Sequence, residues 1–184
     1  MSAIAKQRMT VDQFLAWAEG REGRYELEAG EVIAMSPQRI RHADVKFGAQ
    51  KALERAIGRA GLPCFLVPDG LTVRVDNFTA YEPDAQVYCG PRLGPDDIEV
   101  KNPVVIVEVL SPSTRAIDTG AKLSGYFRVP SVAHYLVVDP VRELVIHHKR
   151  GAVDLIETRI VSSGEITLDP PGLTFDTSEF FAGP

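Results

Sequence analysis

Two carboxylates, Asp84 and Glu108, stand where the chain is otherwise apolar. Glu108 interrupts the run Val104–Leu110, whose other residues are apolar and mostly β-branched. Such a run predicts a strand buried on both faces at the centre of a sheet. A carboxylate buried there is costly unless a cation or hydrogen-bond donors meet it, so Glu108 points to function. Asp84 follows Pro83 at the start of the apolar segment 83–89. Taken alone, it is more typical of a turn residue.

Asp84 and Glu108 belong to one site if segments 83–89 and 103–110 are antiparallel neighbours. The beginning of the first segment then lies opposite the end of the second, which brings Asp84 and Glu108 to one edge of the sheet. Converging carboxylates repel each other unless a cation lies between them, and hard oxygen ligands select Mg²⁺ or Mn²⁺. The pair therefore predicts a divalent metal site.

Lys122 is the candidate cation from the chain itself. Asp118 and Lys122 are four residues apart on the helix expected after the central strand, so they share one helical face. If that face points at the strand end where Glu108 emerges, the ammonium would orient a water or stabilise charge on a phosphate. Each residue alone has a simpler interpretation, Lys122 as a solvated helix residue and Asp118 as an N-cap.

The rest of the chain supplies the elements that position these residues. Helical spacing predicts helices over residues 10–19 and 39–59, and a third that begins at Thr114 or Asp118 and ends near Val129. Alternating or apolar runs predict strands over 24–27, 31–35, 64–67, 71–75, 83–88, 103–110, 133–138, 144–149 and 153–160. The tail after residue 165 is expected to form a short strand and one turn of helix at 178–181.

Composition limits the class of protein. The chain has 184 residues, of which 45% are hydrophobic and 24% charged, and a net charge of −5. These values are typical of one soluble globular domain, which we expect to span residues 1–184. The acidic balance argues against a dedicated nucleic-acid binder, but not against an enzyme whose acidic site is neutralised by a metal. No apolar run approaches ~18 residues, so we expect a cytoplasmic protein without a membrane segment.

Two cysteines, Cys64 and Cys89, lie in apolar, strand-like segments and lack C-x-x-C spacing. Buried free thiols are therefore the preferred interpretation, ahead of a disulfide or a metal site.

A spaced set of motifs resembles one known family. The set comprises Tyr25-Glu26-Leu27 with Gly30-Glu31, Met35-Ser36-Pro37, His42, Pro83-Asp84, residues 108–114, Asp118, Lys122, Tyr126 and residues 135–140. Over roughly residues 10–150, the chain is similar to the Uma-two family of restriction-endonuclease-like proteins, a branch of the PD-(D/E)XK nuclease superfamily.

The resemblance implies an α/β fold with a restriction-endonuclease-like core. It implies a mixed central β-sheet flanked by helices, an N-terminal β-hairpin and a C-terminal antiparallel extension. It also implies that Asp84 and Glu108 are metal ligands. The superfamily lysine follows the glutamate by two residues, where this chain has Leu110. In the resembling family the role passes to the helix, which here means Lys122.

Four further residues are candidates for supporting the site: Glu26, His42, Ser111 and Asp118. Glu26 fits a surface ion pair with an arginine as well as a position facing the site. His42 fits a surface or capping histidine as well as a contact with substrate phosphate or with the metal's surroundings.

These observations together predict a Mg²⁺- or Mn²⁺-dependent endonuclease that hydrolyses phosphodiester bonds in DNA. Asp84 and Glu108 would bind the metal, and Lys122 would assist the attacking water. The alternative is a non-catalytic protein of the same fold that binds nucleic acid or a protein partner. The acidic net charge and the leucine at position 110 leave room for it.

We also expect a homodimer, because nucleases that cut both strands often pair their sites by two-fold symmetry. Apolar residues of the C-terminal hairpin and tail would supply either the interface or a cap on the core: Leu155, Ile156, Phe175, Phe180 and Phe181.

Overall fold

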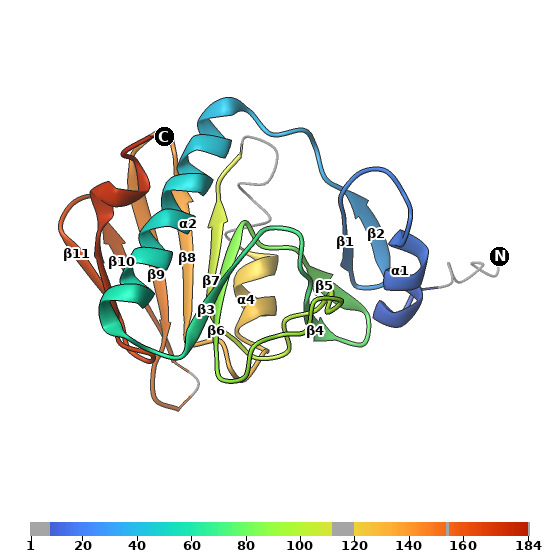
Figure 1. The fold of residues 1–184 in the computed structure, drawn as a ribbon. Helices are drawn as coiled ribbons and strands as arrows, with labels where there is room; N and C mark the ends of the chain where they lie inside the picture. Colours follow the sequence, from blue (N-terminus) through green and yellow to red (C-terminus); the bar gives the residue numbers. More distant parts are fainter. Residues whose placement is uncertain (1–7, 112–119, 154, 184) are drawn as a thin grey trace.

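A six-stranded mixed β-sheet forms the centre of the structure (Figure 1). The structure is a computed structural model that describes residues 8–111, 120–153 and 155–183. The strands lie in the order β10-β9-β8-β7-β6-β3. β7 and β8 are parallel, and the other neighbours are antiparallel. The bounds are β3 Cys64–Pro68, β6 Ala85–Cys89, β7 Pro103–Val109, β8 His134–Asp139, β9 Leu144–Arg150 and β10 Ile156–Val161.

The apolar run around Glu108 is the buried central strand that the sequence predicts. β7 lies between β6 and β8, and its side chains alternate between two hydrophobic clusters. Val107 and Val109 belong to one cluster, and Ile106 belongs to the other together with Leu110, which follows the strand. Because side chains of a strand alternate between its faces, Glu108 shares the face of Ile106.

Helix α2 (Ile40–Ala60) covers one face of this sheet. Its residues Val45, Ala49 and Ala52 recur at helical spacing and pack into the cluster that contains Val107. Gly61 ends the helix in the left-handed conformation, with φ of 61°. Glycine adopts this conformation without steric cost, so the predicted helix end is confirmed.

The C-terminal segment packs on α2. It forms a hairpin of β11 (Glu165–Leu168) and β12 (Leu173–Asp176), followed by the 3₁₀ helix η1 (Thr177–Phe180). The sequence predicts one strand and one turn of helix in this segment. The helical turn is confirmed, and the second strand of the hairpin is one that the sequence pattern missed. The rings of Phe175 and Phe180 stack with centroids 4.8 Å apart and are buried in the α2 cluster. These two aromatic residues cap the core.

The short helix α4 (Ala121–Tyr126) packs on the opposite face of the sheet. Tyr126 contacts Tyr135 of β8, with ring centroids 5.1 Å apart. The predicted start of this helix falls within residues 112–119, which lie outside the described residues. Its end at Tyr126 comes before the predicted end near Val129.

Helix α1 (Val11–Ala18) and a second, four-stranded sheet form the N-terminal part of the structure, at the right of Figure 1. Thr10 and Gln13 form the capping box that the sequence predicts. The strand order is β2-β1-β5-β4. The bounds are β1 Tyr25–Glu28, β2 Glu31–Ala34, β4 Val73–Asp76 and β5 Thr79–Tyr81. The N-terminal hairpin is therefore confirmed, and β5 is a strand that sequence pattern missed.

Cys64 and Cys89 form a disulfide, so the expectation of two free thiols is wrong. The two residues are direct partners in the antiparallel pair of β3 and β6, with Cα atoms 3.9 Å apart. They are 25 residues apart in sequence, and only the strand register brings them together. The disulfide ties the edge strand β3 to its neighbour.

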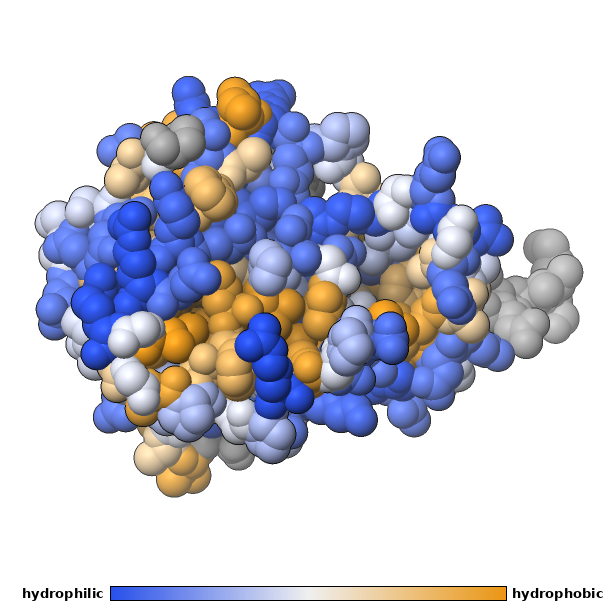
Figure 2. Space-filling model, in the orientation of Figure 1, coloured by the Kyte–Doolittle hydropathy of each residue, from blue (hydrophilic) through white to orange (hydrophobic). Residues whose placement is uncertain are grey.

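None of the helices in the described ranges is long and apolar enough to cross a membrane. Figure 2 shows mostly polar side chains on the face that α2 occupies, with apolar side chains gathered near β3 and β6. Within β3, Leu66 packs against the cluster beneath α2, and Phe65 packs against a separate cluster that contains Val67 and Tyr88. The Arg92 guanidinium lies 5.4 Å from the centroid of the Phe65 ring.

Candidate active site

Asp84 immediately precedes β6 and lies opposite Glu108 in the strand register. Ala85 pairs with Val107 across β6 and β7, so the next position outward sets Asp84 against Glu108. The antiparallel arrangement from which the sequence predicts converging carboxylates is therefore confirmed. Both residues are 4% exposed.

The Asp84 carboxylate is held by α2 and by the backbone of β7. Its Oδ2 accepts a hydrogen bond from the Val109 N–H at 2.8 Å and lies 3.4 Å from His42 Nε2. Its Oδ1 lies 3.8 Å from Lys46 Nζ and 3.5 Å from the Gln38 amide nitrogen. Burial raises the pKa of Asp84, but His42, the Val109 N–H and Lys46 together hold that pKa below its ordinary value. Asp84 is therefore ionised at neutral pH.

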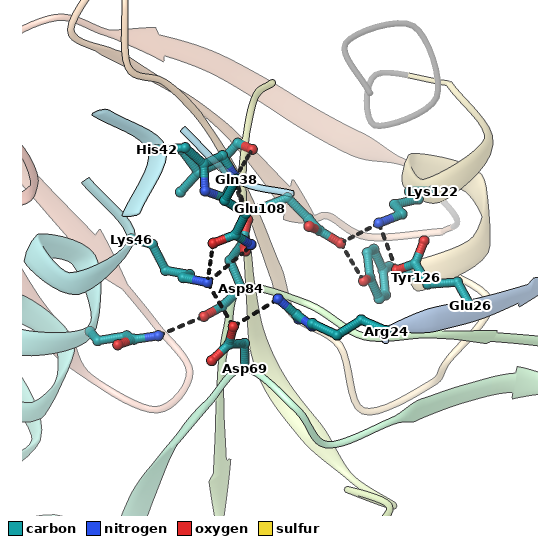
Figure 3. A network of polar contacts seen from close by, with 12 residues as sticks. Arg24, Glu26, Gln38, His42, Lys46, Asp69, Asp84, Glu108, Lys122 and Tyr126 are labelled. Carbon is teal, nitrogen blue, oxygen red and sulfur yellow. Dashed lines mark hydrogen bonds and ion pairs between the residues drawn. The ribbon is translucent and has the colours of Figure 1, made fainter. Parts of the chain in front are cut away.

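The Glu108 carboxylate turns toward α4, where it meets Lys122 and Tyr126 (Figure 3). Its Oε1 accepts hydrogen bonds from the Tyr126 hydroxyl at 2.7 Å and from the Lys122 ammonium at 2.9 Å. The same ammonium donates to Glu26 Oε1 at 2.9 Å. Glu26 Oε1 also accepts the Glu82 N–H at 2.9 Å. Lys122, 3% exposed, is thus a buried cation between two buried carboxylates.

Tyr126 serves this network as a hydrogen-bond donor. Burial raises the pKa of Tyr126 well above its ordinary value, and the negative charges of Glu108 and Glu26 raise it further. The hydroxyl therefore keeps its proton and donates it to Glu108. The rings of Tyr81 and Tyr135 pack on Tyr126 at centroid distances of 5.3 and 5.1 Å and hold it in place.

Helix α2 presents a polar face to Asp84, of which the sequence analysis identified only His42. Lys46 and Gln50 follow His42 at four-residue spacing and so share its face. Gln50 donates its side-chain N–H to the Asp84 carbonyl oxygen at 2.8 Å. His42 Nε2 lies 2.9 Å from the Val109 carbonyl oxygen. The recurrence of polar residues every four positions, beside the apolar stripe, is the sequence signal that could have revealed them.

A rim of charged residues surrounds Asp84 and includes residues that the sequence analysis missed. Asp69 Oδ2 lies 2.6 Å from Lys46 Nζ and 2.9 Å from the Arg24 guanidinium. Arg24 also contacts Glu82 at 3.0 Å. Carboxylates outnumber the Lys and Arg side chains in these contacts, which join Glu26, Asp69, Glu82, Asp84 and Glu108 to Arg24, Lys46 and Lys122. Among the described residues, these contacts leave an excess of negative charge, which is the electrostatic setting in which proteins commonly bind divalent cations.

Two of the four predicted supporting residues, Glu26 and His42, face this site. Glu26 contacts Lys122 rather than a surface arginine, and His42 is buried against Asp84 rather than exposed. Ser111 follows β7 and is half-buried. Asp118 lies outside the described residues.

The donor set suits a hard divalent cation. Mg²⁺ is commonly bound by one or two carboxylates, with its other ligands taken from waters and substrate phosphates. Asp84 and Glu108 supply two carboxylates on adjacent strands. In residues 8–111, 120–153 and 155–183, no group of three or more His, Cys, Asp or Glu side chains is arranged to hold a metal. Two carboxylates are the donor type and number with which proteins commonly bind Mg²⁺ or Mn²⁺ when solvent or substrate supplies the other ligands.

Known proteins share both sequence and fold with this chain. A family model described as "Uma2: Putative restriction endonuclease" matches residues 11–178. The uncharacterized protein slr1290 of Synechocystis sp. is 26% identical over 96% of this chain and 93% of its own length. The uncharacterized protein sll1609 of the same organism is 25% identical over 77% of this chain and 81% of its own length.

A solved structure shows the same fold. It is the crystal structure of "a putative nuclease belonging to DUF820" from Anabaena variabilis, with a TM-score of 0.75 at 16% sequence identity. The match covers 95% of this chain and 98% of that chain. The expected α/β architecture, with a mixed central sheet, flanking helices and an antiparallel C-terminal extension, is confirmed.

Proposed function

Because the chain belongs to the Uma2 family, whose model is described as "Putative restriction endonuclease", we propose that it is a metal-dependent endonuclease that hydrolyses phosphodiester bonds in DNA. One observation carries the proposal. Two buried carboxylates, Asp84 and Glu108, occupy opposite positions at the end of the central strands, and Glu108 contacts the buried ammonium of Lys122. Burying these charges opposes folding, so their presence at a strand end favours a functional role over a structural one.

In this proposal Asp84 and Glu108 hold Mg²⁺ or Mn²⁺. The cation, when bound, would lower the pKa of an attacking water and would place positive charge beside the phosphoryl oxygens. His42 and the Val109 N–H keep Asp84 ionised and fixed in place. Tyr126 orients Glu108 through its hydroxyl.

Lys122 takes the role that the superfamily gives to a lysine two residues after the glutamate. Its ammonium lies 2.9 Å from Glu108 Oε1, so a water or phosphate oxygen that approaches Glu108 meets a positive charge. Glu26 holds the ammonium from the side of the N-terminal hairpin. We therefore assign Glu26 as a positioning residue.

Cleavage of plasmid DNA in the presence of Mg²⁺ or Mn²⁺ tests this proposal. Asp84→Asn and Glu108→Gln should each slow cleavage by more than ~100-fold, because even the partners of metal ligands are commonly worth 10–100-fold. Glu54→Gln is the matched control, since Glu54 is exposed on α2 and outside the site. It should cleave at the wild-type rate. Cleavage that survives both site substitutions, in variants with wild-type circular dichroism, would contradict the assignment.

A second candidate function is binding of nucleic acid without cleavage. The observation that favours it is the Lys122 ammonium, which already neutralises charge on Glu26 and Glu108. Calorimetric titration with Mn²⁺ separates the two functions. Binding that Asp84→Asn abolishes supports the endonuclease, whereas no binding at millimolar concentrations supports the non-catalytic protein.

A further inference from the structure

β10 is an open edge of the main sheet. It pairs with β9 on one side, and among the described residues no strand pairs with its other side. Five of its six residues are exposed, including Ile156 at 40% and Ile160 at 70%. Leu155, which precedes the strand, is 64% exposed. Unpaired backbone groups beside exposed apolar side chains make such a strand a template for pairing with another chain.

The opposite edge of the same sheet is protected. β3 is preceded by Pro63 and ends at Pro68, and proline lacks the N–H that a strand ladder requires. β10 contains no proline. Of the two sheet edges, the one formed by β10 is therefore the one suited to pairing.

We propose that β10 pairs antiparallel with β10 of a second copy of this chain, about a two-fold axis at Thr158. The strand sequence Ile-Glu-Thr-Arg-Ile is self-complementary in this register. Thr158 meets the partner's Thr158, Glu157 meets the partner's Arg159, and Ile156 meets the partner's Ile160. Symmetry makes each of the last two pairs occur twice. Opposite charges and apolar side chains placed directly across two strands stabilise their pairing.

Neighbouring registers lack this complementarity. An axis at Arg159 sets the two Arg159 side chains against each other, and an axis at Glu157 does the same for the two Glu157 side chains. Both registers also place an isoleucine opposite Thr158. Because like charges directly across two strands are destabilising, the charges select the axis at Thr158.

Pairing in this register would continue the two faces of the existing sheet. Ile160 lies directly opposite Ile146 of β9, and Ile146 packs in the cluster beneath α4. Ile156 and Ile160 therefore extend an apolar surface that the fold already contains. Glu157 and Arg159 lie on the other face, where Glu157 stands opposite Lys149 of β9 and Arg159 stands opposite His147. Neither forms an ion pair within the described part of the chain, so both charges can also interact with the partner.

This interface is separate from the proposed active site. β10 lies three strands from β7 in the sheet, and none of its residues contacts Asp84 or Glu108. The inference does not rest on the proposed endonuclease activity. A protein that fails to cleave DNA would leave the interface intact, and a monomeric protein would leave the site intact.

Analytical ultracentrifugation of the full chain tests the interface. The wild-type protein should sediment as a dimer. Glu157→Arg and Arg159→Glu each place like charges opposite one another and should weaken the dimer at least ~10-fold. The double variant E157R/R159E restores opposite charges in the same register and should restore the dimer to within ~3-fold of wild type. A monomeric wild type, single variants that dimerise normally, or a double variant no tighter than the single variants would overturn the proposal.

Oxidative cross-linking tests the register. Thr158→Cys places two thiols opposite each other at the axis and should yield a covalent dimer on a non-reducing gel. Glu157→Cys is the matched control, because its two Cα atoms would lie ~8 Å apart, beyond the reach of a disulfide. The wild-type protein, with Cys64 and Cys89 already joined, should stay monomeric on the same gel. Absence of a Thr158→Cys dimer, or more dimer with Glu157→Cys, would overturn the register.

Discussion

Among single residues, Lys122 should have the largest effect on stability. Its ammonium donates to Glu26 and to Glu108, at 2.9 Å in each case, and is almost completely buried. A buried ion network of this kind contributes little net stability when intact. Removal of its cation takes from both buried carboxylates a positive charge that compensates them, which is strongly destabilising.

Lys122→Met should therefore lower the free energy of unfolding by about 3 kcal/mol or more, measured by urea unfolding at pH 7. Tyr126→Phe keeps the ring but removes one donor from the same Glu108 oxygen, and should cost about 2 kcal/mol. A cost below ~1 kcal/mol for Lys122→Met would mean that both carboxylates are hydrated or protonated. That result would contradict the buried network.

The residues predictable from sequence were those whose type conflicted with their surroundings. Glu108 stood out because it interrupts an apolar strand, and that strand is buried as expected. Lys46 and Arg24 carried no such conflict, because long charged side chains ordinarily lie on solvated surfaces. Their contacts with Asp84 and Asp69 assign them to the site, and for Lys46 the four-residue spacing from His42 is the one signal that the sequence carries.

Among the structural elements, helix α2 and the C-terminal segment are in close backbone contact at Gly48. A Cβ atom at this position would clash with the Phe180 carbonyl oxygen and stand 3.0 Å from its carbonyl carbon. Gly58, on the same helix, has open space around it. The two glycines therefore play different roles. Gly48 permits close packing of backbone on backbone, whereas Gly58 only weakens the helix.

Substitution by alanine should have opposite effects at these two positions. Gly58→Ala should raise the free energy of unfolding by about 1 kcal/mol, because alanine is the better helix former. Gly48→Ala should lower it by about 2 kcal/mol, because the helix or the segment must shift to admit the methyl group. Urea unfolding of both variants measures the difference. A stabilising Gly48→Ala would show that the close approach at Phe180 is absent in solution.

Elements with strong local signals were predictable, and those that depend on tertiary register were not. The capping box at Thr10 and the left-handed Gly61 mark helix ends within a few residues. Strand β5 is only three residues long, too short to show an alternating pattern. The disulfide required the register of β3 against β6, in which Cys64 and Cys89 are partners.

For the protein as a whole, two buried histidines make the free energy of unfolding depend on pH. His134 and His147 lie on adjacent strands, with Nδ1 and Nε2 2.8 Å apart. Burial lowers the pKa of each to about 4, from an ordinary value of 6.5. In the unfolded chain these two imidazoles become protonated below pH 6.5, whereas in the folded chain they stay neutral down to about pH 4.

The free energy of unfolding should consequently be highest above pH 6.5 and fall as the pH decreases toward 4. We expect a loss on the order of 2 kcal/mol between pH 7 and pH 5, measured by urea unfolding. His147→Gln should show a smaller loss over the same interval. The lowered pKa of Asp84 acts below this window, since its contribution is lost only below pH 3.8. An unfolding free energy that stays constant from pH 7 to pH 5 would contradict the buried neutral pair.

The antiparallel pairing of β6 and β7 places the two carboxylates at one end of the sheet and the loop between these strands at the other end. Asp84 precedes one strand and Glu108 lies near the end of the other, so the connection formed by residues 90–102 must lie at the far end. Its tip, at Pro95 and Asp96, is an exposed turn. A fluorophore, an affinity tag or a surface tether attached there would leave the carboxylate end open to a long polymer. The loop of residues 90–102 is therefore a suitable attachment site for immobilising the protein or for labelling it in assays of DNA binding.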